Sequence, residues 1–336
     1  MVRLEDVLES NSRIASELPP GLVAVFVGAT SGIGRATLLR FASHVTKPRI
    51  YFVGRSEVKA GQVLAELNKV NPSGTYHFLK ADVGLLRNVD KVTEEIKAKE
   101  SRVNLLFLTN GTLIFGTKTE EGLHYAAAVS YYARVRFITN LLPLIKDAPG
   151  LRRVVSVFVA GKEGVVFPDD LQGNTVPFRQ QIAHAATMTT LSLEAAAREA
   201  PQVSFIHNFP GRVSTDLIRG EGEAWFLRVM NVLFRIASPL ICMSHEECGQ
   251  RHSFLATSAM YSPAQSGDGD GVVLRSEQEK ARSITGSVGA GVYSILSDGQ
   301  SVGPEIEHLL AKFRSDGYVE RIWANTKADI KQVTGS

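Results

Sequence analysis

The apolar positions of this chain fall into short runs that alternate with longer amphipathic segments. Residues 22–28, 49–54, 75–81, 104–111, 152–160 and 203–211 form six apolar, β-rich runs of strand length. Segments with a helical period, such as 36–45 and 89–100, separate them. Parallel strands that are buried on both faces read as continuous apolar runs. The pattern therefore predicts an α/β protein with a doubly wound parallel sheet and helices on both faces.

The two ends of the chain extend this core. Residues 1–20 predict a short amphipathic helix, which Pro19 and Pro20 end because proline cannot continue a helix. The core covers residues 21–216, and residues 217–336 are expected to add a substrate lid and a helical elaboration to the same domain. Segments 246–261, 276–284 and 303–326 are interpreted as helices and loops that brace the sheet.

Composition and charge limit the classes of partner and cofactor that we expect. The 336 residues are 44% hydrophobic and 21% charged, which is ordinary for a globular protein. The 37 basic and 34 acidic residues leave a formal charge of +3 and form no basic block, so nucleic acid is not an expected partner. Cys242 and Cys248 are too few for a disulfide framework or a zinc site, and no metal is expected.

We expect a cytoplasmic protein. The first 21 residues contain acidic positions and no apolar stretch of signal-peptide length. The most apolar segment, residues 224–243, is interrupted by Arg228, Arg235 and Pro239, so no transmembrane segment is expected.

A glycine-rich segment follows the first apolar run and leads directly into a predicted helix. Glycines at 28, 32 and 34 would let the backbone approach a pyrophosphate, and the free N–H groups of the helix would face the phosphates. This context favours a Rossmann-type dinucleotide site over a simple tight turn. The predicted contacts here are Gly28, Thr30, Ser31, Gly32, Ile33 and Gly34.

With this spacing and four later landmarks, the sequence resembles the short-chain dehydrogenase/reductase family over about residues 21–216. The resemblance implies further cofactor contacts. Asp82 and Val83 would lie near the adenine, although Asp82 could instead be a helix cap. Asn110 and Gly111 match a turn that supports the sheet, with glycine in an alanine place. The segment beside the nicotinamide would include Pro210, Gly211, Val213 and Thr215.

The end of the second run indicates which dinucleotide binds. An acidic residue there would grip the ribose hydroxyls of NAD, but this chain has Arg55, followed by Ser56. A guanidinium can pair bidentately with a 2′-phosphate, so we expect NADP(H) rather than NAD(H). The alternative is a solvated arginine at a strand end.

The catalytic residues of the resembling family are not found in their usual places. In that family a tyrosine four residues before a lysine supplies the proton, and a serine on the preceding strand orients the carbonyl. This chain has no tyrosine between Tyr132 and Tyr261 and no lysine between Lys162 and Lys280. Tyr76 and Lys80 have the right spacing but lie in the third predicted strand, so we interpret them as unrelated to catalysis.

Three side chains are candidates for the proton donor. His184 takes the tyrosine place and Met188 the lysine place in the best register, which could shift by about one helical turn. On an earlier helix the family's asparagine falls at Ser130 or Tyr131, so Tyr131 and Tyr132 are the other candidates. The strand hydroxyl is expected to be lost, because Ser156 falls three positions early and Val159 occupies its place.

These features predict an NADP(H)-dependent oxidoreductase that interconverts an alcohol and a ketone on a hydrophobic small molecule, with natural-product biosynthesis as one setting for this activity. A lid around Trp225, Phe226, Met230, Leu233 and Phe234 would make the pocket apolar. A non-redox isomerase or cyclase on the same scaffold, and a catalytically silent NADPH-binding protein, are the alternatives. A homodimer is possible, as is common in the resembling family.

Overall fold

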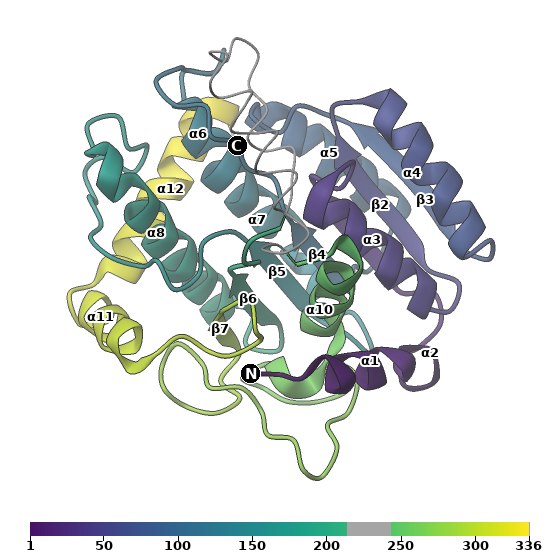
Figure 1. The fold of residues 1–336 in the computed structure, drawn as a ribbon. Coiled ribbons are helices and arrows are strands. Elements are labelled where there is room, and N and C mark those ends of the chain that lie inside the picture. Colours follow the sequence, from purple (N-terminus) through teal and green to yellow (C-terminus); the bar gives the residue numbers. More distant parts are fainter. Residues whose placement is uncertain (214–242, 336) are drawn as a thin grey trace, which may run out of the picture.

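Seven parallel strands form one sheet. A computed structural model describes residues 1–213 and 243–335 of the chain. The strands lie in the order β3-β2-β1-β4-β5-β6-β7 (Figure 1). Their bounds are β1 Val23–Val27, β2 Arg49–Gly54, β3 Thr75–Lys80, β4 Leu105–Leu108, β5 Arg153–Val157, β6 Ser204–Asn208 and β7 Val292–Ile295. The prediction of a Rossmann-type parallel sheet is confirmed.

The seventh strand was not predicted from the sequence. β7 pairs in parallel with β6, with Phe205 opposite Val292 and Asn208 opposite Ile295. It is only four residues long and follows a polar, glycine-containing loop, so its apolar content is too short a signal to separate a strand from a buried turn. Its place at the edge of the sheet is therefore known only from the structure.

Helices cover both faces of the sheet. On one face lie α1 Leu4–Ser12, α2 Ile14–Glu17, α3 Gly32–His44, α4 Glu57–Val70 and α10 His245–Thr257, and on the other lie α5 Leu86–Lys99, α7 Ala133–Ile145, α8 Phe178–Glu199, α11 Pro304–Ser315 and α12 Tyr318–Thr334. A short helix, α6 (Tyr125–Ala127), and a π-helical turn (Ala128–Tyr132) lead into α7, and a 3₁₀ turn (Ala259–Tyr261) follows α10. The first and last helical segments thus brace opposite faces.

The alternation of side chains along each strand produces two apolar cores. In β1, Val25 and Val27 belong to the core under α5, α7 and α8, whereas Ala24 and Phe26 belong to the core under α3, α4 and α10. Successive strand residues point to opposite faces, so a strand buried on both sides must be apolar throughout. This requirement is the physical reason for the continuous apolar runs in the sequence.

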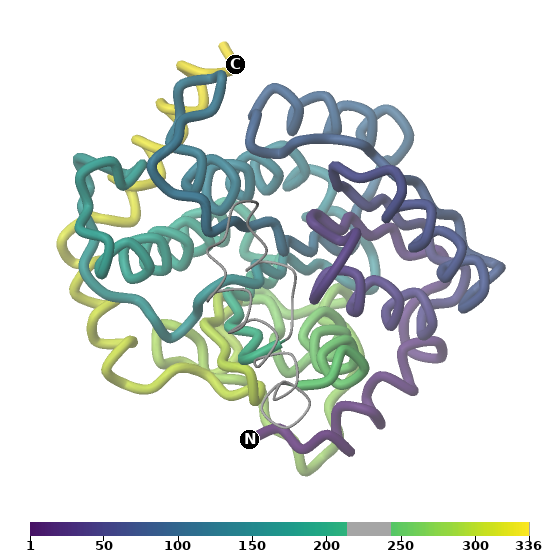
Figure 2. The backbone as a smooth tube through the Cα atoms, turned by 45° about the horizontal axis from the view of Figure 1, so that its top comes forward, coloured from purple at the N-terminus to yellow at the C-terminus, as the bar shows by residue number. Residues whose placement is uncertain are grey.

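The last helix packs along α8 and α5, and α10 packs along α3 (Figure 2). Two tyrosines from the π-helical turn fix α12 in place. The Tyr131 hydroxyl lies 2.7 Å from Thr326 Oγ1, and the Tyr132 hydroxyl donates to the Asp329 carboxylate. These contacts attach the C-terminal helix to the helix pair that follows β4 and β5.

No helix in the described ranges combines the length and the apolar character that crossing a membrane would need. Residues 214–242, which contain the predicted lid, lie outside the described ranges.

Candidate active site

The strand order places a topological switch point at the carboxyl ends of β1 and β4, and we call the region between the loops that follow them the crevice. The chain passes from β1 outward to β2 and β3, and then returns to β4 on the other side of β1. The loops after β1 and β4 therefore leave the sheet in opposite directions. Ligands of open α/β sheets bind at the carboxyl ends of the strands at such a reversal.

The glycine-rich turn after β1 approaches the end of β4 very closely. Gly28 has a φ of 81°, and a Cβ atom there would lie 2.9 Å from the Asn110 backbone nitrogen. A Cβ atom at Gly34 would lie 2.5 Å from Thr109 Oγ1. A side chain at either position would clash with Thr109 or Asn110, which directly follow β4, so this turn can form only with glycine.

The beginning of α3 is open to an anionic ligand. Its N-cap residue, Ser31, makes no side-chain capping hydrogen bond. The N–H groups of a first helical turn have no partners within the helix, and they carry the positive end of the helix dipole. Together with the glycine turn, this geometry fits the pyrophosphate of a dinucleotide. The contacts predicted for Thr30, Gly32 and Ile33 lie in the same turn.

Arg55 and Ser56 stand at the carboxyl end of β2, beside this turn. A Cβ atom at Gly54 would lie 2.5 Å from Thr30 Cγ2, so the two loops touch. Arg55 is exposed, and its Nη1 donates to the Tyr125 hydroxyl at 3.3 Å. Ser56 caps α4 by accepting a hydrogen bond from the Lys59 backbone N–H. The guanidinium thus lies beside the glycine turn, and its contact with a 2′-phosphate stays a prediction.

Asp82 and Val83 follow β3. Asp82 Oδ1 accepts a hydrogen bond from the Gly84 backbone N–H at 2.9 Å. Helix α5 has Leu85 as its N-cap residue, so Asp82 shapes its own turn and does not cap the helix. Both residues are partly exposed at the crevice edge, and their contact with adenine stays a prediction.

Asn110 and Gly111 line the middle of the crevice. The side-chain amide of Asn110 donates to the Val129 carbonyl at 2.6 Å, whereas its Oδ1 is buried and has no partner. Ser130 Oγ accepts a weak hydrogen bond from the Thr112 N–H at 3.4 Å. Of the two residues that could replace the family's asparagine, Ser130 is therefore the one facing this loop.

The segment after β6 borders the other side of the crevice. Gly211 has a φ of 77°, and a Cβ atom there would lie 2.8 Å from Ser297 Cβ. Val213 pairs with Met243 in an isolated bridge. Pro210 lies within the same turn, and Thr215 is outside the described residues.

His184 lies on α8 and is 3% exposed. Its Nδ1 accepts a hydrogen bond from the Phe167 N–H at 3.2 Å, and its Nε2 lies 3.4 Å from the Leu171 carbonyl oxygen. Burial lowers the pKa of His184 below its ordinary value, so the ring is neutral at pH 7. The histidine attaches the loop between β5 and α8 to the helix, and its catalytic role stays a prediction.

The two tyrosine candidates face α12. The Tyr131 hydroxyl lies between Ser192 Oγ and Thr326 Oγ1, and burial raises its pKa to about 12. Burial and the neighbouring Asp329 carboxylate raise the pKa of Tyr132 further. Both phenols are therefore protonated at pH 7, and both already have hydrogen-bond partners. Their participation in proton transfer also stays a prediction.

A buried arginine forms hydrogen bonds with groups at the carboxyl ends of β4 and β5. Arg134, at the start of α7, donates from Nη1 to the Leu108 carbonyl and to Ser156 Oγ. From Nη2 it donates to the carbonyls of Asn110 and Val157. The Ser156 hydroxyl thus accepts a hydrogen bond from Arg134, and the loss of the orienting serine stays a prediction.

The comparisons with known proteins establish the family. The profile described as short chain dehydrogenase matches residues 22–164. The chain is 37% identical over 335 residues to "Oxidoreductase AN1596" of Emericella nidulans, covering 99% of each chain. It is 34% identical to "Short-chain dehydrogenase/reductase SAT2" of Stachybotrys chartarum, covering 93% of each chain. The chain belongs to the short-chain dehydrogenase/reductase family. It is therefore an oxidoreductase of this family.

A solved structure confirms the fold. The L-sorbose reductase of Gluconobacter frateurii, complexed with NADPH and L-sorbose, is 20% identical to this chain, with a TM-score of 0.53. The match covers 70% of this chain and 90% of the reductase. A nicotinamide dinucleotide is the cofactor that the family implies, and the glycine cradle, the open start of α3 and the unpartnered Asn110 Oδ1 fit it.

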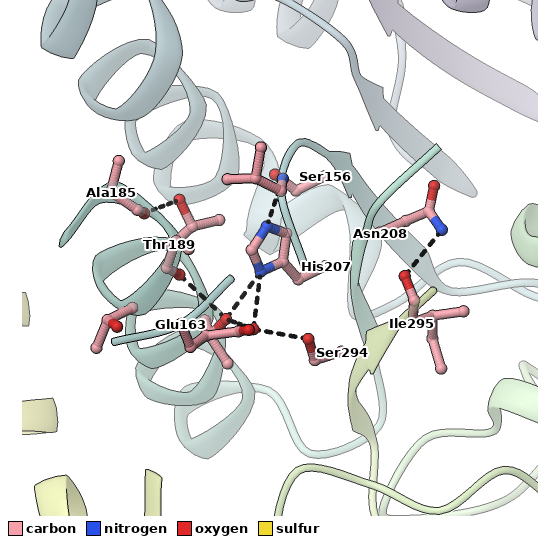
Figure 3. Close-up of polar contacts among 12 residues, drawn as sticks. Ser156, Glu163, Ala185, Thr189, His207, Asn208, Ser294 and Ile295 are labelled. Carbon is pink, nitrogen blue, oxygen red and sulfur yellow. Dashed lines mark hydrogen bonds and ion pairs between the residues drawn. The ribbon is translucent and has the colours of Figure 1, made fainter. Parts of the chain in front are cut away.

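A second polar cluster of this short-chain dehydrogenase/reductase lies between β6, β7 and α8 (Figure 3). His207 Nε2 accepts from the Val159 N–H at 3.2 Å, so the ring N–H that is present lies on Nδ1. Nδ1 lies 2.8 Å from Thr190 Oγ1, which donates to Glu163 Oε1 at 2.8 Å. Ser294 donates to the same carboxylate oxygen at 2.7 Å. The other oxygen of Glu163 is buried without a partner.

Sequence reasoning missed this cluster and Arg134. His207 and Asn208 interrupt an apolar strand, and such polar positions in a buried strand could have indicated a buried network. Glu163 and Arg134 gave no comparable signal, because charged residues in loops and on helices are usually solvated. Among the described residues, no three side chains of the metal-binding types come together.

Glu163→Gln tests whether the cluster holds an ionised carboxylate. Burial alone would raise the pKa of Glu163, but the contacts with His207, whose Nδ1 lies 3.5 Å from Glu163 Oε1, and with Ser294 outweigh it and lower the pKa below the ordinary value. The stabilisation is then complete above the unfolded-state pKa of about 4.3 and is lost as the pH falls through the folded-state value. At pH 7 the variant should lose about 1–3 kcal/mol of unfolding free energy.

The measurement is urea unfolding of both proteins between pH 7 and pH 3, and the difference should shrink toward the acid end. Glu57→Gln is the matched control, because Glu57 is an exposed carboxylate that pairs with the surface residue Lys80. It should change stability by less than about 0.5 kcal/mol. A difference for Glu163→Gln that is the same at every pH would contradict an ionised carboxylate in the cluster.

Proposed function

We propose that the protein is an NADP(H)-dependent oxidoreductase that interconverts an alcohol and a ketone on a hydrophobic small molecule. The observation that carries the proposal is Arg55, held at the end of β2 beside the glycine turn. A carboxylate at this place would repel a 2′-phosphate, whereas a guanidinium can pair with it through two hydrogen bonds. The phosphorylated cofactor is therefore favoured over NAD(H).

The mouth of the crevice supports a hydrophobic substrate. Five exposed apolar side chains follow the carboxyl ends of β4 and β5 or lie at the start of α8; they are Leu113, Ile114, Val165, Phe178 and Ile182. We call them the mouth surface. The Phe115 and Phe178 rings pack edge to face at 5.6 Å, which joins the β4 loop to α8. A Cβ atom at Gly164 would lie 2.9 Å from Ala183 Cβ, which joins the β5 loop to the same helix.

An exposed apolar surface at a ligand crevice commonly marks a binding site. We therefore propose that the mouth surface contacts the apolar body of the substrate, as a natural-product ketone would provide. All five predicted lid residues, Trp225, Phe226, Met230, Leu233 and Phe234, lie outside the described residues.

In the reducing direction, bound NADPH would supply a hydride to the carbonyl carbon, and the carbonyl oxygen would take up a proton. Helix α8 carries neither tyrosine nor lysine, so we propose that the usual catalytic pair is absent. The donor would come from His184, Tyr131 or Tyr132. His184 is the only one of the three on α8, and it could act if its Nε2 exchanged the Leu171 carbonyl for the substrate.

The same absence favours a second candidate, a non-redox isomerase or cyclase, and with it a silent NADPH-binding protein. Reduction adds two hydrogen atoms to the product, whereas isomerisation leaves the mass unchanged.

We further propose a cytoplasmic protein. A homodimer through α8 would have to accommodate α12, which packs along that helix.

Arg55→Ala should weaken NADPH binding by roughly ten- to a hundredfold, because it removes a charge-assisted hydrogen-bonded pair. NADH binding should change by less than about threefold, since NADH lacks the 2′-phosphate. Isothermal titration calorimetry with each cofactor measures both effects. Arg102→Ala is the control, because Arg102 is an exposed arginine just before β4, at the amino ends of the strands and away from the glycine turn. Equal losses for NADPH and NADH would contradict the role of Arg55.

The pair Phe178→Ser and Ile182→Ser tests the mouth surface. Together they should raise the KM for a lipophilic ketone by roughly tenfold, because they remove two apolar contacts from the substrate. The dissociation constant for NADPH should stay unchanged. Val58→Ser is the control, since Val58 is equally exposed but lies on α4. An unchanged KM for the double variant would show that the substrate binds elsewhere.

A further inference from the structure

The strongest unexplained feature of the crevice is the charge of Arg134. Arg134 is 3% exposed, and its guanidinium donates four hydrogen bonds, three to carbonyl oxygens and one to a hydroxyl. Among the described residues, no carboxylate forms an ion pair with it. Its Nε has no partner either. A buried cation without a counter-ion is costly, so such an arrangement is unusual unless something else in the site compensates for it.

The position of this charge is tied to the ends of β4 and β5. The carbonyls of Leu108, Asn110 and Val157 all accept from the guanidinium, so the charge lies directly beneath the loops that form the middle of the crevice. The Arg134 Cζ atom also lies 5.3 Å from the centroid of the Phe158 ring, the first residue after β5. This packing fixes the plane of the guanidinium and prevents it from moving away from the crevice.

The charge is retained at neutral pH. Burial lowers the pKa of Arg134 to about 9, which still leaves the guanidinium protonated at pH 7. The Glu163 carboxylate does not neutralise the charge of Arg134, because Glu163 Oε1 accepts its hydrogen bonds from Thr190 and Ser294. The crevice floor therefore carries a net positive charge that no described side chain pairs with.

We propose that Arg134 makes this crevice bind the reduced, uncharged nicotinamide in preference to the oxidised, cationic one. This inference rests on the proposed function, since it requires the nicotinamide to lie above β4 and β5. NADPH and NADP⁺ differ by one positive charge on the ring. A fixed cation in a low-dielectric site repels the oxidised ring and leaves the reduced ring unaffected.

The first test uses the wild-type protein alone. Calorimetric titrations with NADPH and with NADP⁺ at pH 7 give two dissociation constants. NADPH should bind at least roughly tenfold more tightly, the order expected for one unit charge at short range in a partly buried site. Equal affinities would overturn the inference without touching the proposed function. Failure of both cofactors to bind would overturn the proposed function itself.

The second test separates the charge from the hydrogen bonds. Arg134→Gln keeps hydrogen-bond donors but loses the charge, and it should reduce the preference for NADPH by roughly tenfold. Arg134→Lys keeps the charge and should retain the preference to within about twofold. Ser156→Ala is a further control, because it removes one acceptor of the guanidinium and leaves the charge in place.

Circular dichroism checks that each variant is folded. A preference that survives in a folded Arg134→Gln protein would overturn the inference. If that variant does not fold, the wild-type ratio and the Arg134→Lys ratio still decide the question. A Lys variant that binds both cofactors equally would also contradict a role for the charge.

Discussion

The close approach between the turn after β1 and the end of β4 is the constraint on which the site depends. A Cβ atom at Gly28 or Gly34 would overlap atoms of Thr109 or Asn110, so the two loops can touch only because glycine stands at both positions. This contact brings the start of α3 beside the middle of the crevice. The rest of the sheet supplies the rigid support, because its strands are buried on both faces and cannot shift independently.

The polar groups beneath this crevice form two separate networks with different chemistry. Arg134 joins β4 to β5 with an unpaired positive charge, whereas Glu163 joins α8, β6 and β7 through Thr190, His207 and Ser294. The Phe158 ring contacts both networks, because its centroid lies 5.3 Å from Arg134 Cζ and it stacks on the His207 ring at 6.3 Å. In a chain whose α8 has no lysine, a guanidinium on α7 provides a cation at the carboxyl edge of the sheet.

Much of the fold could be predicted from the sequence, because buried parallel strands and the glycine turn leave direct patterns. Six strands and the cofactor turn follow from local residues. β7 could not be predicted, since four apolar residues give no periodicity. The hydrogen-bond partners of His184 and Tyr131 also could not be predicted. A sequence shows that a side chain can donate a proton, but it does not show that Phe167 or Thr326 already forms a hydrogen bond with that side chain. Arg134 was missed because its burial depends on contacts between distant strands.

The most direct test of the account uses NADPH that carries deuterium at the transferring position of the nicotinamide. The purified protein is incubated with this cofactor and a panel of lipophilic ketones, and the products are analysed by mass spectrometry. The account predicts an alcohol that carries one deuterium on the former carbonyl carbon. A product with the mass of its substrate and no deuterium would contradict it and would identify an isomerase on this scaffold.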